Sequence, residues 1–337
     1  MLMTEEKKAV LQVDNLSIAF DMANGKQTNV VEAVSFQVFE GETLALVGES
    51  GSGKSVTSLA IMRLLQMPPA CITSGKILLN GKDLLQMKLD DMSSVRGNEM
   101  SMIFQEPMTS LDPVFKISSQ LIEGIRRHQQ LDKKQAFAIA LSMLKEVGIA
   151  NAEKVIHEYP HQLSGGMRQR VMIAMAMANN PKLLLADEPT TALDVTVQAQ
   201  ILQLMLKMKE EHGSSILFIT HDMGVVAETA DRVMVMYAGQ IVESGPVEQI
   251  FTDPKHPYTK ALLQTMPSLA TNERRLPTIP GTVPSPSNFS AGCRFTPRCQ
   301  HAMDICDRTI PTERSFEDGQ IVRCHLYKEK EVAAHDA

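Results

Sequence analysis

The sequence predicts an α/β protein with two parts, and three observations lead to this prediction. Apolar runs alternate with segments of helical period, as in a parallel sheet covered by helices. A glycine-rich loop at residues 48–55 directly follows one of these runs. Four of the five cysteines stand close together near the C-terminus, within residues 293–324. A chain of 337 residues holds about two domains of ordinary size.

The composition limits the function classes. A hydrophobic fraction of 44% and a charged fraction of 21% are typical of a folded protein. The net charge of −6 argues against a protein that mainly grips nucleic-acid phosphates, because that needs a basic surface. No apolar run approaches the ~20 residues that span a bilayer, and the first residues lack the apolar core of a signal peptide. We therefore expect a soluble, cytosolic chain that reaches a membrane through a partner.

The N-terminal part predicts strands. Residues 11–20 alternate between apolar and polar, and residues 36–48 form an apolar run that ends in glycine. The Asn24-Gly25 pair between them indicates a turn. Short strands are expected to continue at 75–84 and 99–105.

From about residue 107 the period becomes helical. Phe137, Leu141 and Leu144 fall on one helical face, with Asp132 and Gln135 able to cap the start and Gly148 the end. Apolar strands with little alternation then return at 182–188, 214–222 and 232–239. A helical insert, about 107–170, is thus expected to interrupt the α/β part.

The C-terminal part begins at a proline-rich stretch. Five prolines between Pro267 and Pro286 exclude a continuous helix or a central strand. We expect an extended linker into a small cysteine-bearing appendix with little core of its own. The predicted division is 8–266 and 267–328.

The glycine-rich loop predicts a phosphate site. A strand runs directly into the pattern GxxxxGK[ST], and a plausible helix follows it. Small residues let backbone N–H groups surround a phosphate at a helix N-terminus, Lys54 would reach the β- and γ-phosphates, and the Ser55 hydroxyl would ligate Mg²⁺. A flexible glycine/serine turn is the alternative, and the flanking strand and helix make it the minor one. The residues expected to bind nucleotide are Gly48, Glu49, Ser50, Gly51, Ser52, Gly53, Lys54, Ser55 and Val56.

Two acidic residues complete the predicted site. The apolar strand 183–186 delivers Asp187 and Glu188 to its carboxyl end, where α/β sheets bind ligands. Asp187 suits contact with Mg²⁺, directly or through water, and Glu188 is placed to polarise an attacking water. Two solvated carboxylates would be the favoured interpretation without the phosphate loop.

The remaining motifs resemble those of ATP-binding-cassette (ABC) ATPases. Leu163-Ser-Gly-Gly-Met167 resembles their signature, Gln105 the Q-loop, Thr191-Ala-Leu-Asp194 the D-loop and His221 the switch histidine. Met167 departs from the commoner glutamine but leaves the Ser-Gly-Gly donors intact. The resemblance covers residues ~9–250. It implies a P-loop NTPase fold: a RecA-like core, an antiparallel β-subdomain and the helical insert.

The resemblance also implies roles for residues. Gln105 and His221 would act in hydrolysis beside Glu188, with Gln105 also a ligand of Mg²⁺, and Phe20 would stack on adenine. Two cassettes would sandwich ATP, each offering its Ser164, Gly165, Gly166 and Asp194 to the nucleotide held by the other. In isolation, Ser164 is better explained as a helix N-cap.

A closer resemblance lies downstream. The segment around His256-Pro257-Tyr258, residues 279–284 and the late cysteines resemble ATPases of dipeptide and oligopeptide importers, with glutathione and nickel importers close by. This implies two transmembrane permease subunits, a second homologous ATPase in a heterodimer, and an extracytoplasmic solute-binding protein. It also implies a peripheral position on the cytoplasmic face of the bacterial inner membrane and no nucleic acid. The rival, a soluble ABC protein acting on nucleic acid or ribosomes, usually has two cassettes or a coiled coil, and this chain has no second GxxxxGK[ST].

The cysteines Cys293, Cys299, Cys306 and Cys324 predict a metal site. Zinc is the default for four thiolates, but structural zinc sites usually use C-x2–4-C pairs, and none is present. Four thiolates also suit a 4Fe–4S cluster. The same cysteines in peptide-importer ATPases imply such a cluster, which we favour over zinc, in a structural or redox-sensing role.

Overall fold

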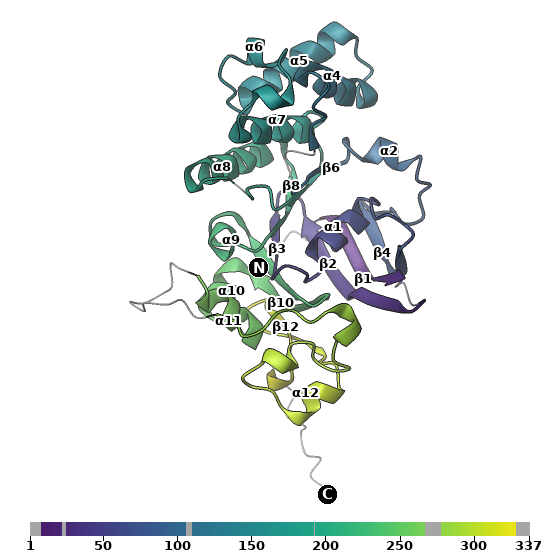
Figure 1. Ribbon diagram of the computed structural model, residues 1–337, viewed down its shortest axis with the longest axis vertical. Coiled ribbons are helices and arrows are strands. Elements are labelled where there is room, and N and C mark those ends of the chain that lie inside the picture. The colour runs from purple at the N-terminus through teal and green to yellow at the C-terminus, as the bar shows by residue number, and fades with distance from the viewer. Residues whose placement is uncertain (1–7, 22–24, 106–109, 192, 267–277, 328–337) are drawn as a thin grey trace, which may run out of the picture.

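A mixed sheet of eight strands forms the centre of the molecule (Figure 1). The computed structural model describes residues 8–21, 25–105, 110–191, 193–266 and 278–327. The sheet order is β11-β12-β10-β9-β3-β8-β7-β6, and its middle strands are parallel. Every residue of β3, β7 and β8 is buried, which confirms the expectation of strands covered on both faces. The parallel strands are β3 (Thr43–Val47), β6 (Met100–Ile103), β7 (Leu183–Asp187), β8 (Ser215–Thr220) and β9 (Arg232–Tyr237).

A second, antiparallel sheet comes from the N-terminal part, as predicted, in the order β2-β1-β4-β5. Its alternating strands place Leu11, Val13 and Ile18 in a core shared with β3. Asn24 of the predicted turn lies outside the described residues. The strands are β1 (Ala9–Asp21), β2 (Gln27–Phe39), β4 (Ala70–Leu79) and β5 (Lys82–Asp83).

The helical insert stands at the opposite end of the molecule from the C-terminal segment (Figure 1). Asp132 and Gln135 form the predicted capping box, and Gly148 follows the helix end with φ +74°. Ile125, Leu144 and Ile173 are fully buried in the core of this part. The helices here and next to it are α2 (Met92–Val95), α4 (Ile117–His128), α5 (Lys133–Glu146), α6 (Ala152–Val155), α7 (Gly165–Met177) and α8 (Val195–His212).

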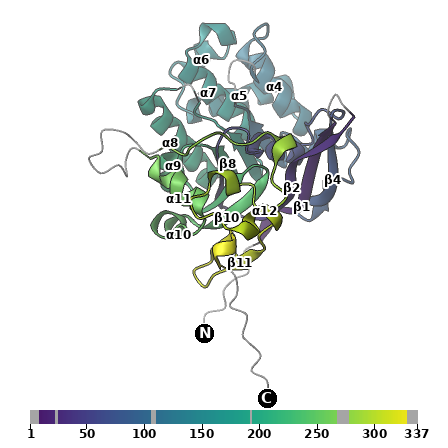
Figure 2. The ribbon, with the colours of Figure 1, turned by 60° about the horizontal axis from the view of Figure 1, so that its bottom comes forward.

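The C-terminal segment packs closely on the core of the main sheet. Strand β12 (Ile321–Arg323) pairs with β10 (Gln240–Pro246), so that the cysteine-bearing segment extends the main sheet. The Phe295 side chain, 2% exposed, packs against the rings of Tyr237 and Tyr258. Figure 2 shows the segment in yellow in front of β10. The other elements are α9 (Met223–Thr229), α10 (Val247–Thr252), α11 (Pro257–Gln264), α12 (Asp304–Arg308) and β11 (Glu313–Ser315).

Part of the predicted linker, residues 267–277, lies outside the described residues. From 278 on, the chain has no regular element until a short turn at Pro286–Asn288, as its prolines predict. Among the described helices, none combines the length and apolar character that crossing a membrane requires.

Candidate nucleotide site

The loop between β3 and α1 (Lys54–Ile61) has backbone conformations that require glycine. Gly48 has φ +153°, and a Cβ there would lie 2.1 Å from the Met236 carbonyl oxygen. Gly53, the N-cap of α1, has φ +103°. The loop therefore brings its backbone close to the sheet at the helix N-terminus, where N–H groups without helical partners favour an anion.

Lys54 is buried inside this loop. Its side-chain ammonium donates to the carbonyl oxygens of Gly48, at 2.7 Å, and Glu49, at 3.1 Å. Burial lowers the pKa of Lys54, whereas the carboxylates of Glu188, Asp187 and Glu49 raise it in part. The cation is thus held by weak neutral acceptors, which phosphate oxygens can replace.

Ser55 and Asp187, both expected to contact Mg²⁺, lie next to each other. The Ser55 hydroxyl donates to Oδ1 of Asp187 at 3.2 Å, and the Ser58 hydroxyl donates to Oδ2 at 3.4 Å. Burial raises the pKa of Asp187, and the hydrogen bond from Ser55 opposes that rise. Hydroxyl and carboxylate oxygens are suitable ligands for Mg²⁺, which takes further ligands from phosphates and water. The donor set therefore fits Mg²⁺ bound together with a nucleotide.

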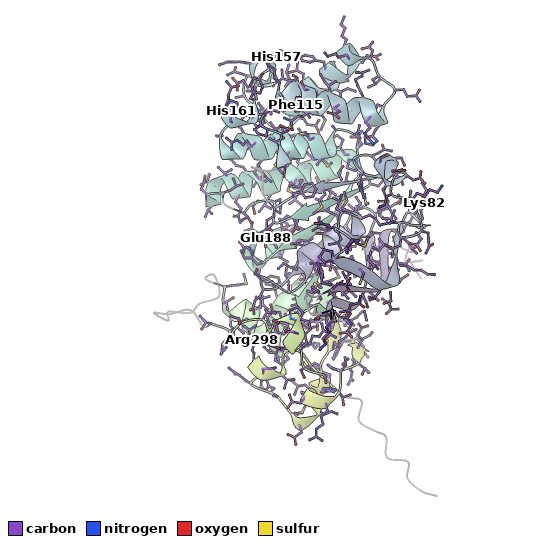
Figure 3. The ribbon with its side chains drawn as sticks, turned by 45° about the vertical axis from the view of Figure 1, so that its right-hand side comes forward. Lys82, Phe115, His157, His161, Glu188 and Arg298 are labelled. Carbon is purple, nitrogen blue, oxygen red and sulfur yellow. The ribbon has the colours of Figure 1, made fainter. Side chains whose placement is uncertain are left out.

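Two other residues predicted for the site, Gln105 and His221, contact Glu188. Its Oε2 accepts hydrogen bonds from Gln105 Nε2 at 3.0 Å and from the Thr191 hydroxyl at 2.9 Å. Its Oε1 lies 3.1 Å from Nδ1 of His221. Burial raises the pKa of Glu188, but the hydrogen bonds from His221 and Thr191 outweigh it, so the pKa lies below its ordinary value. Figure 3 shows Glu188 near the middle of the molecule.

The signature residues and Asp194 of the D-loop motif lie at exposed helix starts. Ser164 caps α7, its hydroxyl accepting from the Met167 N–H at 3.4 Å, so the structure displays the cap that the sequence left as an alternative. Asp194 caps α8 by accepting from the Val197 N–H at 2.9 Å. Both hydrogen bonds stay within their own helices, and Ser164, Gly165 and Asp194 are exposed. Phe20, at the end of β1, is half-buried against the core of the antiparallel sheet.

The four late cysteines line one cavity, which we call the cysteine cavity. None of the four forms a disulfide. Burial raises the pKa values of the Cys293 and Cys299 thiols, and that of Cys324 to about 11. Within the ranges that the structure describes, no group of three or more His, Cys, Asp or Glu residues is arranged to hold a metal ion.

His256 also lines the cysteine cavity and is 1% exposed. Its Nδ1 accepts from the Tyr258 N–H at 3.0 Å, and burial lowers the pKa of the imidazole to about 3. The neutral ring must therefore carry its proton on Nε2, and this buried atom has no hydrogen-bond partner among the described residues.

Three contacts of the nucleotide site were not predicted from the sequence. Thr191 donates to Glu188, the Tyr258 hydroxyl accepts from the Glu49 N–H, and Arg298 pairs with Glu49. Thr191 lies in the D-loop motif, which hinted at its place. Neither period nor motif spacing indicates that residues 258 and 298 reach the loop at 48–55, because the contact depends on how the C-terminal segment folds back.

Two family models match different parts of the chain. Residues 31–191 match the family model described as ABC transporter. Residues 242–306 match the model described as the C-terminal region of oligopeptide/dipeptide transporters.

Two similar proteins cover nearly the whole chain, and a similar solved structure covers most of it. The oligopeptide transport ATP-binding protein AppD of Bacillus subtilis (strain 168) is 51% identical over 321 residues, 95% of this chain and 98% of AppD. OppD of the same organism is 53% identical over 318 residues, 94% of this chain and 88% of OppD. A solved dimer of the ATP-binding cassette MJ0796, in a post-hydrolysis state with ADP and Pi, gives a TM-score of 0.63 at 27% identity and covers 70% of this chain and 98% of that one.

The fold, the phosphate loop and these matches define the class of protein as an ABC ATPase. Within that class, the chain belongs to the family of oligopeptide and dipeptide transport ATP-binding proteins.

Proposed function

We propose that this chain is the ATP-hydrolysing subunit of an importer for short peptides. The observation that carries the hydrolytic part is the meeting of Gln105 and His221 at Glu188, on the strand that also delivers Asp187 to Ser55. The family and its relatives, named as oligopeptide transport proteins, support the substrate class.

The chemistry follows from the geometry. The backbone N–H groups of the loop and Lys54 would bind the phosphates, and Ser55 and Asp187 would hold Mg²⁺, which shields phosphate charge. Glu188, kept ionised by its donors, would polarise the attacking water and take its proton while the bond between the γ-phosphorus and the bridging oxygen to ADP breaks. His221 and Gln105 would orient the carboxylate and the water.

A complete site would require a second cassette. Ser164, Gly165, Gly166 and Asp194 lie at exposed helix starts, where free N–H groups and the helix dipole suit a phosphate from another molecule. We assign that partner to a second homologous ATPase, giving a heterodimer. Phe20 would stack on adenine at the edge of the antiparallel sheet.

A cleft between the core and the helical insert supports contact with a permease. Its lining is largely apolar and includes the exposed Leu64 and Phe104, next to Gln105. A short helix from one of the two transmembrane permease subunits would dock there, and the chain would then lie on the cytoplasmic face of the bacterial inner membrane. An extracytoplasmic solute-binding protein would deliver the peptide. The lining residues are Met62, Leu64, Arg96, Gly97, Ser101, Met102, Phe104, Ser110, Leu111, Met172, Met175 and Ala176.

The cysteine cavity would hold a 4Fe–4S cluster, with zinc as the alternative. Four thiols from one short segment around a single cavity fit the ligand set of such a cluster, and the unpartnered Nε2–H of His256 suits a sulfur acceptor.

The function is tested with the chain assembled with its permeases, sister ATPase and binding protein in vesicles. Addition of short peptides should raise ATP hydrolysis and accumulate peptide inside the compartment that exposes the ATPase. Hydrolysis that no peptide stimulates, with a fully assembled complex, would contradict the proposed substrate class.

A further inference from the structure

The C-terminal segment reaches into the nucleotide loop through one side chain. Arg298 Nη1 donates to Oε2 of Glu49 at 3.0 Å, across 249 positions of sequence. The Arg298 side chain is 6% exposed and that of Glu49 27%. Figure 3 places Arg298 below Glu188, toward the C-terminal segment. The ion pair is thus largely shielded from water. A shielded pair is stronger than an exposed pair.

Arg298 is itself held firmly. Its Nε donates to the Pro280 carbonyl at 2.7 Å, and its Nη1 also donates to the Tyr237 hydroxyl at 3.3 Å. The guanidinium lies 5.7 Å from the centre of the Tyr237 ring. Its Nη2 donates to the carbonyls of Ile279 and Gly281, so the planar guanidinium is fixed by several acceptors and holds Nη1 toward Glu49.

Glu49 is held at more than one point. Its backbone N–H donates to the Tyr258 hydroxyl at 2.9 Å, and its carbonyl accepts from Lys54 Nζ at 3.1 Å. Its second carboxylate oxygen, Oε1, is buried and has no hydrogen-bond partner among the described residues. A carboxylate in a loop that must accept a triphosphate opposes that ligand unless its charge is balanced.

We propose that Arg298 is a positioning residue of the nucleotide site: by pairing with Glu49 it fixes the phosphate loop and cancels a negative charge beside the bound phosphates. ATP affinity then depends on the fold of the C-terminal segment, far along the chain from the loop. This inference rests on the proposed nucleotide site.

The experiment measures the ATP dissociation constant and the KM and kcat of hydrolysis, using the full chain assembled with its partners. Arg298→Ala should raise the dissociation constant and KM about tenfold, because it leaves the Glu49 carboxylate unpaired, while kcat stays within about twofold. The dissociation constant and KM of Arg298→Lys should lie between those of the wild type and Arg298→Ala, since lysine keeps the charge but loses the planar geometry. Arg308→Ala, at the exposed end of α12, is the matched control and should leave all three values unchanged.

A second substitution separates positioning from mere structural support. In the Arg298→Ala background, Glu49→Gln removes the unpaired charge and should restore ATP affinity to within about threefold of the wild type. Wild-type ATP affinity in Arg298→Ala would overturn the proposal. So would a loss that Glu49→Gln does not restore. Lys54→Ala checks the site itself: if it binds ATP like the wild type, the proposed nucleotide site fails, whatever Arg298 does.

Discussion

Nδ1 of His221 lies 3.1 Å from Oε1 of Glu188, so that the residue after β8 meets the residue after β7 at one edge of the sheet. Glu188 has φ +46°, a conformation that few residues other than glycine adopt. Such a backbone costs of order 1–3 kcal/mol and persists where its surroundings hold it, which is common at functional sites. Here the Glu188 N–H donates to the Ile219 carbonyl at 2.8 Å and the Glu188 carbonyl accepts from the Thr191 N–H at 3.2 Å, and these backbone hydrogen bonds hold it.

The first prediction concerns hydrolysis. Glu188→Gln should keep ATP binding and lower kcat at least about a hundredfold, because the amide cannot accept a proton from water while the loop is unchanged. Lys54→Ala should instead weaken ATP binding, since it removes the cation inside the loop. Equilibrium ATP binding and single-turnover hydrolysis measure the two effects. Full turnover by Glu188→Gln in the assembled complex would remove Glu188 from the catalytic role.

The second prediction is a pH dependence. Hydrogen bonds hold the pKa of Glu188 below its ordinary 4.5, so the carboxylate should stay ionised from pH 8 down through pH 5 and lose its charge only below. Thr191→Val removes one donor and so raises that pKa, which should move the acid limb of kcat upward in pH. The neighbouring Thr190→Val is the matched control. If Thr191→Val and wild type share one acid limb, the hydrogen bond has no such effect.

The third prediction follows from the exposed signature. If Ser164 and Gly166 complete a site on another cassette, hydrolysis by the chain alone should be slow and should rise with protein concentration. Addition of the sister ATPase and the permeases should raise it further. A Gly166→Val variant in one subunit should impair the nucleotide site of the other, which a mixed dimer with one Glu188→Gln subunit can reveal. Fast hydrolysis by a proven monomer would contradict the shared site.

The sequence predicted the central architecture because local patterns determine it. Buried runs such as 183–187 have one favourable environment, a parallel sheet with both faces covered, and the phosphate loop needs only adjacent residues. The contacts of Arg298 and Tyr258 with Glu49 could not be predicted, since they depend on long-range packing. The same holds for β12, whose pairing with β10 no local pattern indicates.

The fourth prediction concerns how the start of α11 is held against β10. Glu243 on β10 is 0% exposed and accepts hydrogen bonds from the N–H groups of Lys255, at 2.6 Å, and His256, at 3.0 Å. Glu243→Gln leaves one oxygen for two donors and turns an amide NH₂ toward the other, which should cost about 1–3 kcal/mol in the free energy of unfolding. Urea unfolding measures the loss, with the exposed Glu248→Gln on α10 as control. Equal midpoints for both variants would show that the two hydrogen bonds contribute little.

The last prediction concerns the group in the cysteine cavity. Protein purified without oxygen should be brown and should contain about four iron and four acid-labile sulfide per chain, because four thiolates around one cavity are the ligand set of a 4Fe–4S cluster. Cys299→Ser should lower both contents, since it removes one ligand, while Cys71→Ser, on β4 in the antiparallel sheet, should leave them unchanged. His256→Phe should keep the iron but shift the reduction potential of the cluster, because it removes the Nε2–H that would donate to a cluster sulfur. Stoichiometric zinc without sulfide in the same preparation would exclude the cluster and leave a zinc site formed by the same thiols.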